Sequence, residues 1–448
     1  MENRTTQLMF EMKLKRWKSL KRHCYAIGLF LLLANIVMAQ SSGPAWIKQE
    51  LVSNGVFKSP EYQFTDVYDD YKSNENIKGV FINGLEFFGK ATKFFAWYGV
   101  PKGLEAGQKA PAVVCVHGGG GTAFEAWVKQ WNERGYIAIS MSLEGNVPGP
   151  KDENNQKPRF EFSGPQRDGF FKDVDKDLQD QWFYHAVADV ILANSLLRDS
   201  KFSTQIDTTK IGITGISWGG ILTNVITGID NRWAFSIPVY GCGYLNETPQ
   251  YAGQLAKNTP EQREFYLKNW EPSLYLPLQS QPTLHVNGTN DGHFSMNSFT
   301  KTYWASPKEK YLRVEHNMRH GHGAGWRPID SYQFADYITK SDTQRLTFSD
   351  NSLEANGRLS YSYKYAGSLD AAYLYYTTDT ADWSGKGYEW LEKEATISAG
   401  ERTISAELPE NALAYFVNAI NAEGLIFSSP MAIGKAEIGR RVNQNTKK

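Results

Sequence analysis

The sequence predicts an α/β fold, a mostly parallel sheet with helices on both faces, followed by a small C-terminal β-sandwich. Two observations support the first part. Short, continuous apolar runs alternate with stretches of helical period, and a serine flanked by glycines directly follows one of these runs. A third observation supports the second part, because beyond about residue 344 the apolar residues recur at every second position.

The composition is typical of a globular chain with more than one domain. The 448 residues exceed what one hydrophobic core usually holds. With 41% hydrophobic and 21% charged residues, the chain is unlike disordered proteins. Basic and acidic residues both number 48, so net charge gives no electrostatic reason to expect a nucleic acid partner. The aromatic content of 14% permits stacking on sugars.

The amino end is expected to be a signal peptide, residues 1–39. Basic residues between Lys13 and Arg22 precede an uncharged run, and Ala39 follows with the small-residue pattern of a cleavage site. The run of 14 residues from Tyr25 to Met38 reaches only about 21 Å as a helix, short of a hydrocarbon layer of about 30 Å. An uncleaved anchor is the alternative. We therefore expect an exported protein, periplasmic or secreted, without a stable membrane anchor after cleavage.

Residues 40–78 show no sustained period and are expected to wrap around the α/β domain of residues 79–343. Within that domain, Ala112–Val116 is apolar throughout, as in a strand buried on both faces. The expected strands are 79–83, 92–100, 112–116, 136–141, 210–214 and 310–315, and the expected helices are 124–133, 177–198 and one from about Asp330.

Two segments are too long to be plain connections. Residues 144–176 contain glycine, proline and charges without a period, and loops of this length in a compact domain are usually functional or disordered. We expect this loop to lie over the site. In residues 243–276, Thr259 and Gln262 flank a proline in the pattern of a capping box, which predicts a short extra helix at the rim of the site.

The strongest chemical motif is Gly215-Ile216-Ser217-Trp218-Gly219-Gly220, directly after an expected strand. A nucleophile on a sharp strand-to-helix turn has a strained backbone, and the flanking glycines relieve its crowding. This context makes Ser217 the candidate nucleophile.

Asp291 is the candidate acid, because it lies in a glycine-containing turn that follows the apolar stretch beginning at Pro282. In this position a carboxylate orients the catalytic imidazole and stabilises its cation. An aspartate that bonds only to its own turn is the alternative. The chain order Ser, Asp, His is typical of the α/β-hydrolase fold.

Three histidines follow the last expected strand. His316 is nearest the strand end and is expected to face the sheet, whereas His320 and His322 lie on the loop that must reach Ser217. His320, which is followed by glycine, is the candidate base, and His322 is the alternative base. The His-x-His pattern also suggests a metal, but no third ligand with recognisable spacing accompanies it, so no metal and no cofactor are expected. The other histidines, His117, His185, His285 and His293, are expected to be structural, with His117 bracing the glycine loop.

An oxyanion hole needs two preorganised N–H donors, each contributing about 3 kcal/mol to lowering the barrier. The expected donors are the Trp218 amide and a glycine amide of the 118–121 loop, with Gly119 and Gly120 as candidates. A phosphate-binding loop is the alternative, but it requires a following Lys-Ser/Thr pair, which the sequence lacks.

The chain resembles secreted α/β-hydrolases of the acetylxylan-esterase and dienelactone-hydrolase-like type over about residues 79–340. The resemblance depends on segments 112–121 (ending HGGGG), 182–186 (WFYHA), 212–220 (GITGISWGG), 239–243 (VYGCG) and 317–323. It implies hydrolysis of acyl esters, most simply acetyl groups on a polysaccharide or oligosaccharide, with Ser217, Asp291 and His320 as triad.

Two alternative functions remain at this point. The prolyl oligopeptidase family shares the catalytic domain, so a serine peptidase is one alternative. Against it, the 77 residues from 40 to 116 are too few for the propeller that usually accompanies such peptidases. The other is an inactive carbohydrate-binding protein, which intact Ser217, Asp291 and His320 disfavour.

Beyond residue 344, apolar and aromatic residues alternate with polar ones, as at Tyr361 and Tyr363, at Tyr373 and Tyr375, and within 413–419. This pattern predicts a β-sandwich over residues 344–435. This region resembles the carboxy-terminal segment of the PhoPQ-activated pathogenicity-related hydrolases. We expect it to bind glycan, to dock on the catalytic domain or to act in sorting. Residues 436–448 are expected to be a basic, solvated tail.

The mature chain retains two cysteines, Cys115 and Cys242. In the usual strand order of this fold the nucleophile strand separates their strands, which places them about 9 to 10 Å apart. A disulfide needs Cα atoms within about 7 Å, so both thiols are expected to be free and buried.

Overall fold

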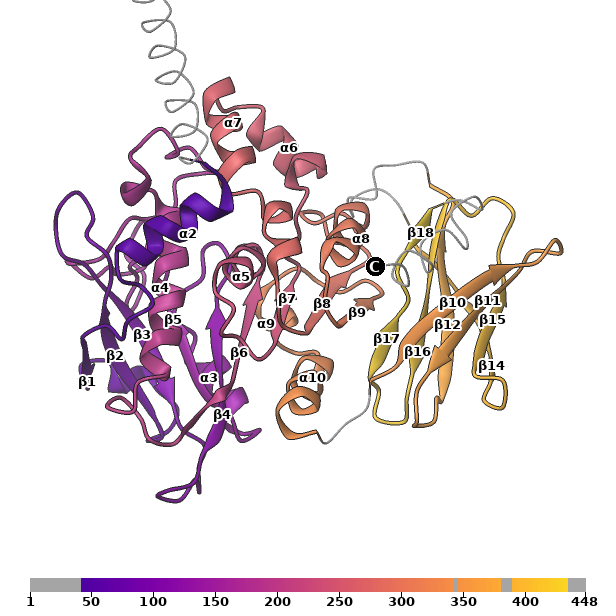
Figure 1. The fold of residues 1–448 in the computed structure, drawn as a ribbon, viewed down its shortest axis with the longest axis horizontal. Helices are drawn as coiled ribbons and strands as arrows, with labels where there is room; N and C mark the ends of the chain where they lie inside the picture. The colour runs from indigo at the N-terminus through magenta and orange to yellow at the C-terminus, as the bar shows by residue number, and fades with distance from the viewer. Residues whose placement is uncertain (1–41, 342–344, 380–388, 434–448) are drawn as a thin grey trace, which may run out of the picture.

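The computed structural model describes residues 42–341, 345–379 and 389–433, and it contains an α/β domain beside a β-sandwich (Figure 1). The expected signal peptide and the expected basic tail lie outside the described residues. Among the described residues, no helix combines the length and the apolar character needed to cross a membrane.

The α/β domain is built on one nine-stranded sheet in the order β1-β2-β3-β5-β4-β6-β7-β8-β9. The pairs from β5–β4 to β8–β9 are parallel, and the pairs among β1, β2, β3 and β5 are antiparallel. The fold-class prediction is confirmed. The strands are β1 Tyr62–Thr65, β2 Ile77–Asn83, β3 Lys93–Gly99, β4 Ala110–Val116, β5 Ile137–Met141, β6 Ile206–Ile216, β7 Ser236–Val239, β8 Thr283–Gly288 and β9 Lys310–Glu315.

Helices cover the sheet in two groups. The α-helices are α2 Gly43–Ser53, α3 Glu125–Asn132, α4 Trp182–Leu197, α5 Trp218–Ile229, α6 Pro249–Leu255, α7 Pro260–Asn269, α8 Met296–Ala305, α9 His322–Gly325 and α10 Ile329–Lys340. Short 3-10 helices are η1 Asp69–Tyr71, η2 Leu178–Asp180, η3 Leu245–Glu247, η4 Pro272–Leu274 and η5 Leu276–Leu278. Helices α3 and α10 are joined by a bond from the Tyr332 hydroxyl to Gln130 (2.8 Å), and α4 and α5 pack together.

Residues 40–78 contain more regular structure than the sequence predicted. Helix α2 and strand β1 lie within residues 40–78, where no period was evident, because only Ile47 and Leu51 of α2 are buried and β1 is short. The segment nevertheless lies against α4, since Ser195 donates a hydrogen bond to the Val56 carbonyl at 2.8 Å. All 16 residues of α4 are consequently buried.

The extra helix after residue 243 forms as the capping box predicted. The Thr259 side chain accepts a hydrogen bond from the Gln262 amide at 3.2 Å, and the Gln262 side chain accepts one from the Thr259 amide at 2.9 Å. The Asn258 side chain, just before this box, donates to the Phe170 carbonyl at 3.1 Å. The two long interruptions of the domain therefore meet.

The C-terminal domain is a β-sandwich of two antiparallel sheets, as predicted. Its strands are β10 Thr347–Leu353, β11 Arg358–Lys364, β12 Ala371–Thr377, β13 Leu391–Glu394, β14 Thr396–Ser398, β15 Thr403–Glu407, β16 Ala414–Ile420, β17 Ile426–Ser428 and β18 Ala432–Ile433. On β12, Leu374 belongs to the core of the sandwich, whereas Tyr375 packs with Phe416 on the opposite face, within the core of the α/β domain.

The sandwich therefore docks on the α/β domain, one of the three roles expected for it. The Val314 amide of β9 donates to Ser428 Oγ at 2.8 Å, and Asn418 donates to the Val314 carbonyl at 2.9 Å. The expectation for His316 is wrong, because its ring contacts Tyr375 and its Nε2 lies 3.0 Å from the Trp390 carbonyl oxygen. The reason is that the sandwich covers the end of β9.

Both described cysteines are free and buried, as expected. Cys115 lies on β4 and Cys242 follows β7, and β6 separates these strands in the sheet. Burial raises the pKa of both thiols well above the ordinary value, so neither is a reactive thiolate.

Candidate active site

Ser217 lies on the sharp turn between β6 and α5, with φ 59° and ψ −115°. The turn brings backbone atoms too close for side chains at the neighbouring glycines. A Cβ on Gly215 would lie 2.1 Å from the Gly219 carbonyl oxygen, and a Cβ on Gly219 would lie 2.0 Å from the Val116 carbonyl oxygen. The glycines of the motif therefore allow the serine to adopt a strained conformation at the end of the sheet.

The structure brings the three candidate catalytic residues together in one hydrogen-bonded chain. His320 Nε2 lies 3.0 Å from Ser217 Oγ, and His320 Nδ1 lies 2.7 Å from Asp291 Oδ2. With the Nδ1 proton donated to the carboxylate, Nε2 is left to accept the serine proton. Asp291 is buried (2% exposed), whereas Ser217 is 9% exposed and the His320 side chain is 23% exposed, so solvent reaches the serine and histidine but not the carboxylate.

The orientation of Asp291 and His320 is fixed by their neighbours. Asp291 Oδ1 accepts hydrogen bonds from the amides of His293 (2.8 Å) and Phe294 (3.0 Å), which leaves Oδ2 for His320. The imidazole of His320 packs against the rings of Tyr240 and His293, each at 4.5 Å between centroids. These contacts restrict the base to one position.

His322, the alternative base, occupies a different place. Its Nε2 accepts a hydrogen bond from the Gly118 amide at 2.9 Å, so it supports the glycine loop instead of Ser217. Burial, together with the charge of Lys157, lowers its pKa to about 4. A neutral imidazole at this position can accept the Gly118 N–H, and a protonated one cannot.

The candidate oxyanion donors differ in their positions relative to Ser217. The Trp218 amide begins α5, and Gly119 lines the same cavity as Ser217. Gly118 is bonded to His322, as described above. Gly120 does not line the cavity: it is a turn residue with φ 69°, and its carbonyl accepts a hydrogen bond from Lys157 at 2.6 Å. Trp218 and Gly119 are therefore the better-placed pair.

His117 holds the glycine loop through hydrogen bonds of its buried ring. Its Nε2 accepts a hydrogen bond from the Leu143 amide at 2.9 Å, and its Nδ1 donates to the Gly118 carbonyl at 2.7 Å. Burial lowers its pKa to about 3. His185 and His285 are similarly buried, with pKa values lowered by burial to about 4 and about 3. His293, also expected to be structural, instead lines the cavity beside His320.

A cavity of about 390 Å³ opens in front of Ser217. The loop of residues 144–176 contributes to its wall, as expected. From the second interruption it is helix α6 that contributes, whereas α7, the helix predicted from the capping box, has no residue in the wall. Sequence reasoning missed the individual residues, because they carry no motif and their only signal was their location in those interruptions. They are Arg167, Gly169, Phe170, Gln250, Tyr251 and Gln254.

Arg167 is the charged residue of this wall. Its guanidinium lies over the Trp218 ring at 4.9 Å, and its Nε is 3.6 Å from the carboxylate of buried Glu144. The cavity therefore combines aromatic rings with amide and guanidinium donors, which is suitable for a polar ligand with hydroxyl groups.

Asp291, His293 and His320 also offer ligand atoms within 4.8 Å of one another. Two of these residues already bond to each other through the atoms described above. His322 is not part of the group, so the His-x-His pattern itself builds no metal site in the described part of the chain.

Comparisons with known proteins show one family similarity and several structural similarities. Residues 62–268 match the family model of acetyl xylan esterase (AXE1), whereas a search of functionally curated proteins finds no match. Among solved structures, the acetyl xylan esterase from Paenibacillus sp. R4 is similar at 18% identity and a TM-score of 0.51, covering 65% of this chain and 92% of that one. Acetyl xylan esterase 1 from Thermoanaerobacterium sp. JW/SL YS485 is similar at 15% identity with the same TM-score and coverage.

The structural likenesses establish the fold. The family match covers strands β1 to β7, the nucleophile turn and helix α6, and it ends before Asp291 and His320. The chain therefore has the α/β-hydrolase fold, and residues 62–268 are similar to the acetyl xylan esterase family.

Proposed function

We propose that the protein removes acyl groups, most simply acetyl groups, from a polysaccharide or oligosaccharide, with Ser217, His320 and Asp291 as catalytic triad. The observation that carries this proposal is the chain of hydrogen bonds from Ser217 Oγ through His320 to Asp291, with distances of 3.0 and 2.7 Å, at the base of an open cavity.

In the first half-reaction, Ser217 Oγ attacks the ester carbonyl carbon while His320 Nε2 takes the hydroxyl proton. The oxyanion of the tetrahedral intermediate accepts hydrogen bonds from the amides of Trp218 and Gly119. The intermediate collapses, and His320 returns the proton to the departing sugar oxygen. The products are an acyl-serine and the free sugar hydroxyl.

In the second half-reaction, His320 removes a proton from water, and the hydroxide attacks the acyl-serine. Collapse of this second intermediate releases the carboxylic acid and restores the Ser217 hydroxyl with the proton from His320. Asp291 keeps the imidazole in the required tautomer throughout. The scheme uses no metal and no cofactor.

The substrate class is supported by the residues around Ser217. Tyr251 and Phe170, which stack on each other, give part of the wall aromatic character, while Gln250, Gln254 and Arg167 offer hydrogen-bond donors for hydroxyl groups. An acylated carbohydrate carries both features, an apolar ring face and many hydroxyls. We also propose, from the sequence of residues 1–39, that the protein acts after export.

Acetate release provides the test. Acetylated xylo-oligosaccharides, a chromogenic acetate ester and a panel of peptide amides should be compared with the wild-type protein and with Ser217→Ala. We expect acetate release from the first two substrates, lost in the variant, and no amide cleavage. Amide turnover that exceeds ester turnover would support a peptidase, and the absence of turnover on every substrate would support a binding protein.

A further inference from the structure

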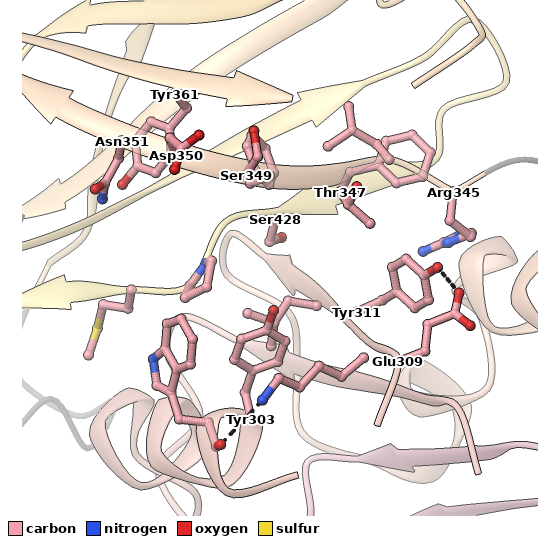
Figure 2. Close-up of a pocket in the computed structure, with 18 of the residues that line it drawn as sticks. Tyr303, Glu309, Tyr311, Arg345, Thr347, Ser349, Asp350, Asn351, Tyr361 and Ser428 are labelled. Atoms are coloured by element: carbon pink, nitrogen blue, oxygen red, sulfur yellow. Dashed lines mark hydrogen bonds between the residues drawn. The ribbon is translucent and has the colours of Figure 1, made fainter. Parts of the chain in front are cut away.

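A second cavity, of about 300 Å³, lies where the two domains meet. One wall comes from α8 and β9, and the other comes from β10, β17 and the following residues (Figure 2). Figure 2 shows Tyr303 and Tyr311 on one side, facing Thr347, Ser349 and Ser428 on the other. This interdomain cavity shares no lining residue with the cavity at Ser217.

Arg345 lies at one end of the interdomain cavity. Its side chain is buried (7% exposed), and none of its guanidinium nitrogens has a hydrogen-bond acceptor among the described residues. The guanidinium instead contacts aromatic faces, with centroids at 4.9 Å for Phe427 and 5.5 Å for Tyr311. A buried cation without acceptors is costly, so a ligand that supplied oxygen acceptors to this guanidinium would be bound favourably.

The carboxylates near Arg345 already have other partners. Asp330 accepts hydrogen bonds from Arg313 Nε at 2.9 Å and from the Ile426 amide at 2.8 Å. Glu309 accepts the hydroxyl protons of Tyr311 and, at 2.9 Å, Tyr337. Asp350 lies at the opposite end of the cavity (Figure 2). An acceptor for Arg345 must therefore come from another source.

Lys310 adds a second cation to the same cavity. Its ammonium donates to the carbonyls of Ser306 (2.6 Å) and Trp304 (3.2 Å), and it lies 4.8 Å from the ring centroid of Tyr303 and 5.4 Å from that of Trp304. Burial lowers its pKa to about 8. The cavity thus has two cationic groups whose acceptors are neutral carbonyls or aromatic rings, which favours an anionic ligand.

The remaining lining indicates what carries the negative charge. Tyr303 and Trp304 are half-buried and present rings to the cavity, which the hydroxyl-bearing residues Thr347 and Ser349 also line. Aromatic faces next to hydroxyl groups suit a sugar ring, with its apolar face and hydroxyl edge. A simple inorganic anion would leave these surfaces unused.

We propose that the interdomain cavity is a second binding site for a carboxylated sugar unit, with the carboxylate on Arg345 and the ring against Tyr303 and Trp304. Such a site would hold an acidic glycan on the protein at a place separate from Ser217.

Calorimetric titration of the Ser217→Ala protein tests the proposal independently of turnover. The probes are methyl glucuronoside, the matched neutral methyl glucoside, and sodium sulfate. We expect the glucuronoside to bind at least about tenfold more tightly than the glucoside, as a charge-assisted, two-donor contact predicts. Equal affinity for the two sugars would overturn the role of Arg345, and sulfate binding as tight as glucuronoside binding would overturn the assignment to a sugar.

Three variants locate the binding. Arg345→Met should weaken glucuronoside binding at least about tenfold, whereas Arg358→Met, which removes an exposed arginine of the same sandwich, should leave it unchanged. Arg167→Met tests the other cavity. Loss of binding in this variant with retention in Arg345→Met would assign the ligand to the active site and overturn the proposal.

A folding defect in Arg345→Met would not leave the question open. A second variant, Trp304→Ser, removes ring surface from the half-buried side of the cavity without changing a buried charge, and it should weaken glucuronoside binding severalfold. Unchanged affinity in Trp304→Ser would overturn the placement of the ring. In addition, glucuronoside should raise the Tm of the wild-type protein and the glucoside should not.

Discussion

His322 supports the glycine loop through one hydrogen bond, and its removal should separate this role from that of His320. In His322→Ala the Gly118 amide, which donates to His322 Nε2 at 2.9 Å, loses its acceptor in a partly buried place. An unsatisfied N–H of this kind costs about 1 to 3 kcal/mol. The loop also carries Gly119, whose amide is one of the two proposed oxyanion donors, so displacement of the loop should weaken that donor.

The size of the catalytic effect follows from that geometry. Loss of one oxyanion donor lowers kcat by at most about 10² to 10³-fold, so His322→Ala should lose between about tenfold and 10³-fold. His320→Ala removes the base itself and should lose about 10⁴-fold or more. His322→Gln, whose side-chain oxygen can accept the Gly118 N–H, should recover part of the loss.

Steady-state kinetics with a chromogenic acetate ester measures these differences. The kcat of the wild type and of the three variants should be compared at saturating substrate, with Tm recorded for each to detect unfolding. If His322→Ala lost as much kcat as His320→Ala while both remained folded, His322 would have a direct role in proton transfer and the reasoning would be refuted.

Four further outcomes are expected. Ser217→Ala should lower ester turnover by about 10⁴ to 10⁶-fold with little change in Tm, and turnover within about tenfold of wild type would exclude it as nucleophile. Alkylation of the unreduced, denatured protein should modify both Cys115 and Cys242, whereas a linked peptide found by mass spectrometry would contradict the strand-order argument. Burial lowers the pKa of His117 to about 3, so the unfolded chain binds more protons than the folded one between about pH 6.5 and 3, and stability falls as the pH drops through this range. In urea titrations, His117→Asn should reduce this fall in the free energy of unfolding by up to about 1.4 kcal/mol per pH unit. An equal fall in both proteins would argue against a contribution from His117. Thr259→Ala should lower the free energy of unfolding by about 1 kcal/mol through loss of the cap, and an unchanged urea midpoint would show that the cap contributes nothing.

The parallel strands and the nucleophile turn could be predicted because their signals are local. Ala112–Val116 is apolar throughout since β4 is buried on both faces, and the glycines around Ser217 are required by backbone contacts within a few residues. The chain order Ser, Asp, His then indicated Asp291 and His320 as the candidate acid and base. The structure then distinguished His320 from His322 by their hydrogen bonds, which the sequence could not do.

The parts that were missed depend on contacts between distant segments. Helix α2 buries only Ile47 and Leu51, so its sequence has almost no apolar period. Arg167 and Tyr251 reach the cavity from segments without motifs, and their positions are set by contacts such as that of Asn258 with the Phe170 carbonyl. On β12, both faces are buried in different cores, so alternation alone did not indicate which face docks.

The contact between β9 and the sandwich has a consequence for solubility. β9 is the last strand of the large sheet, and such an edge normally offers its free amide and carbonyl groups to other chains. Here Ser428 and Asn418 occupy the amide and the carbonyl of Val314. The sandwich thus prevents other chains from pairing with this edge. A chain truncated before β10 would expose the unpaired edge of β9 together with the apolar surface beneath Phe416. We therefore expect the α/β domain to need the sandwich in order to stay soluble.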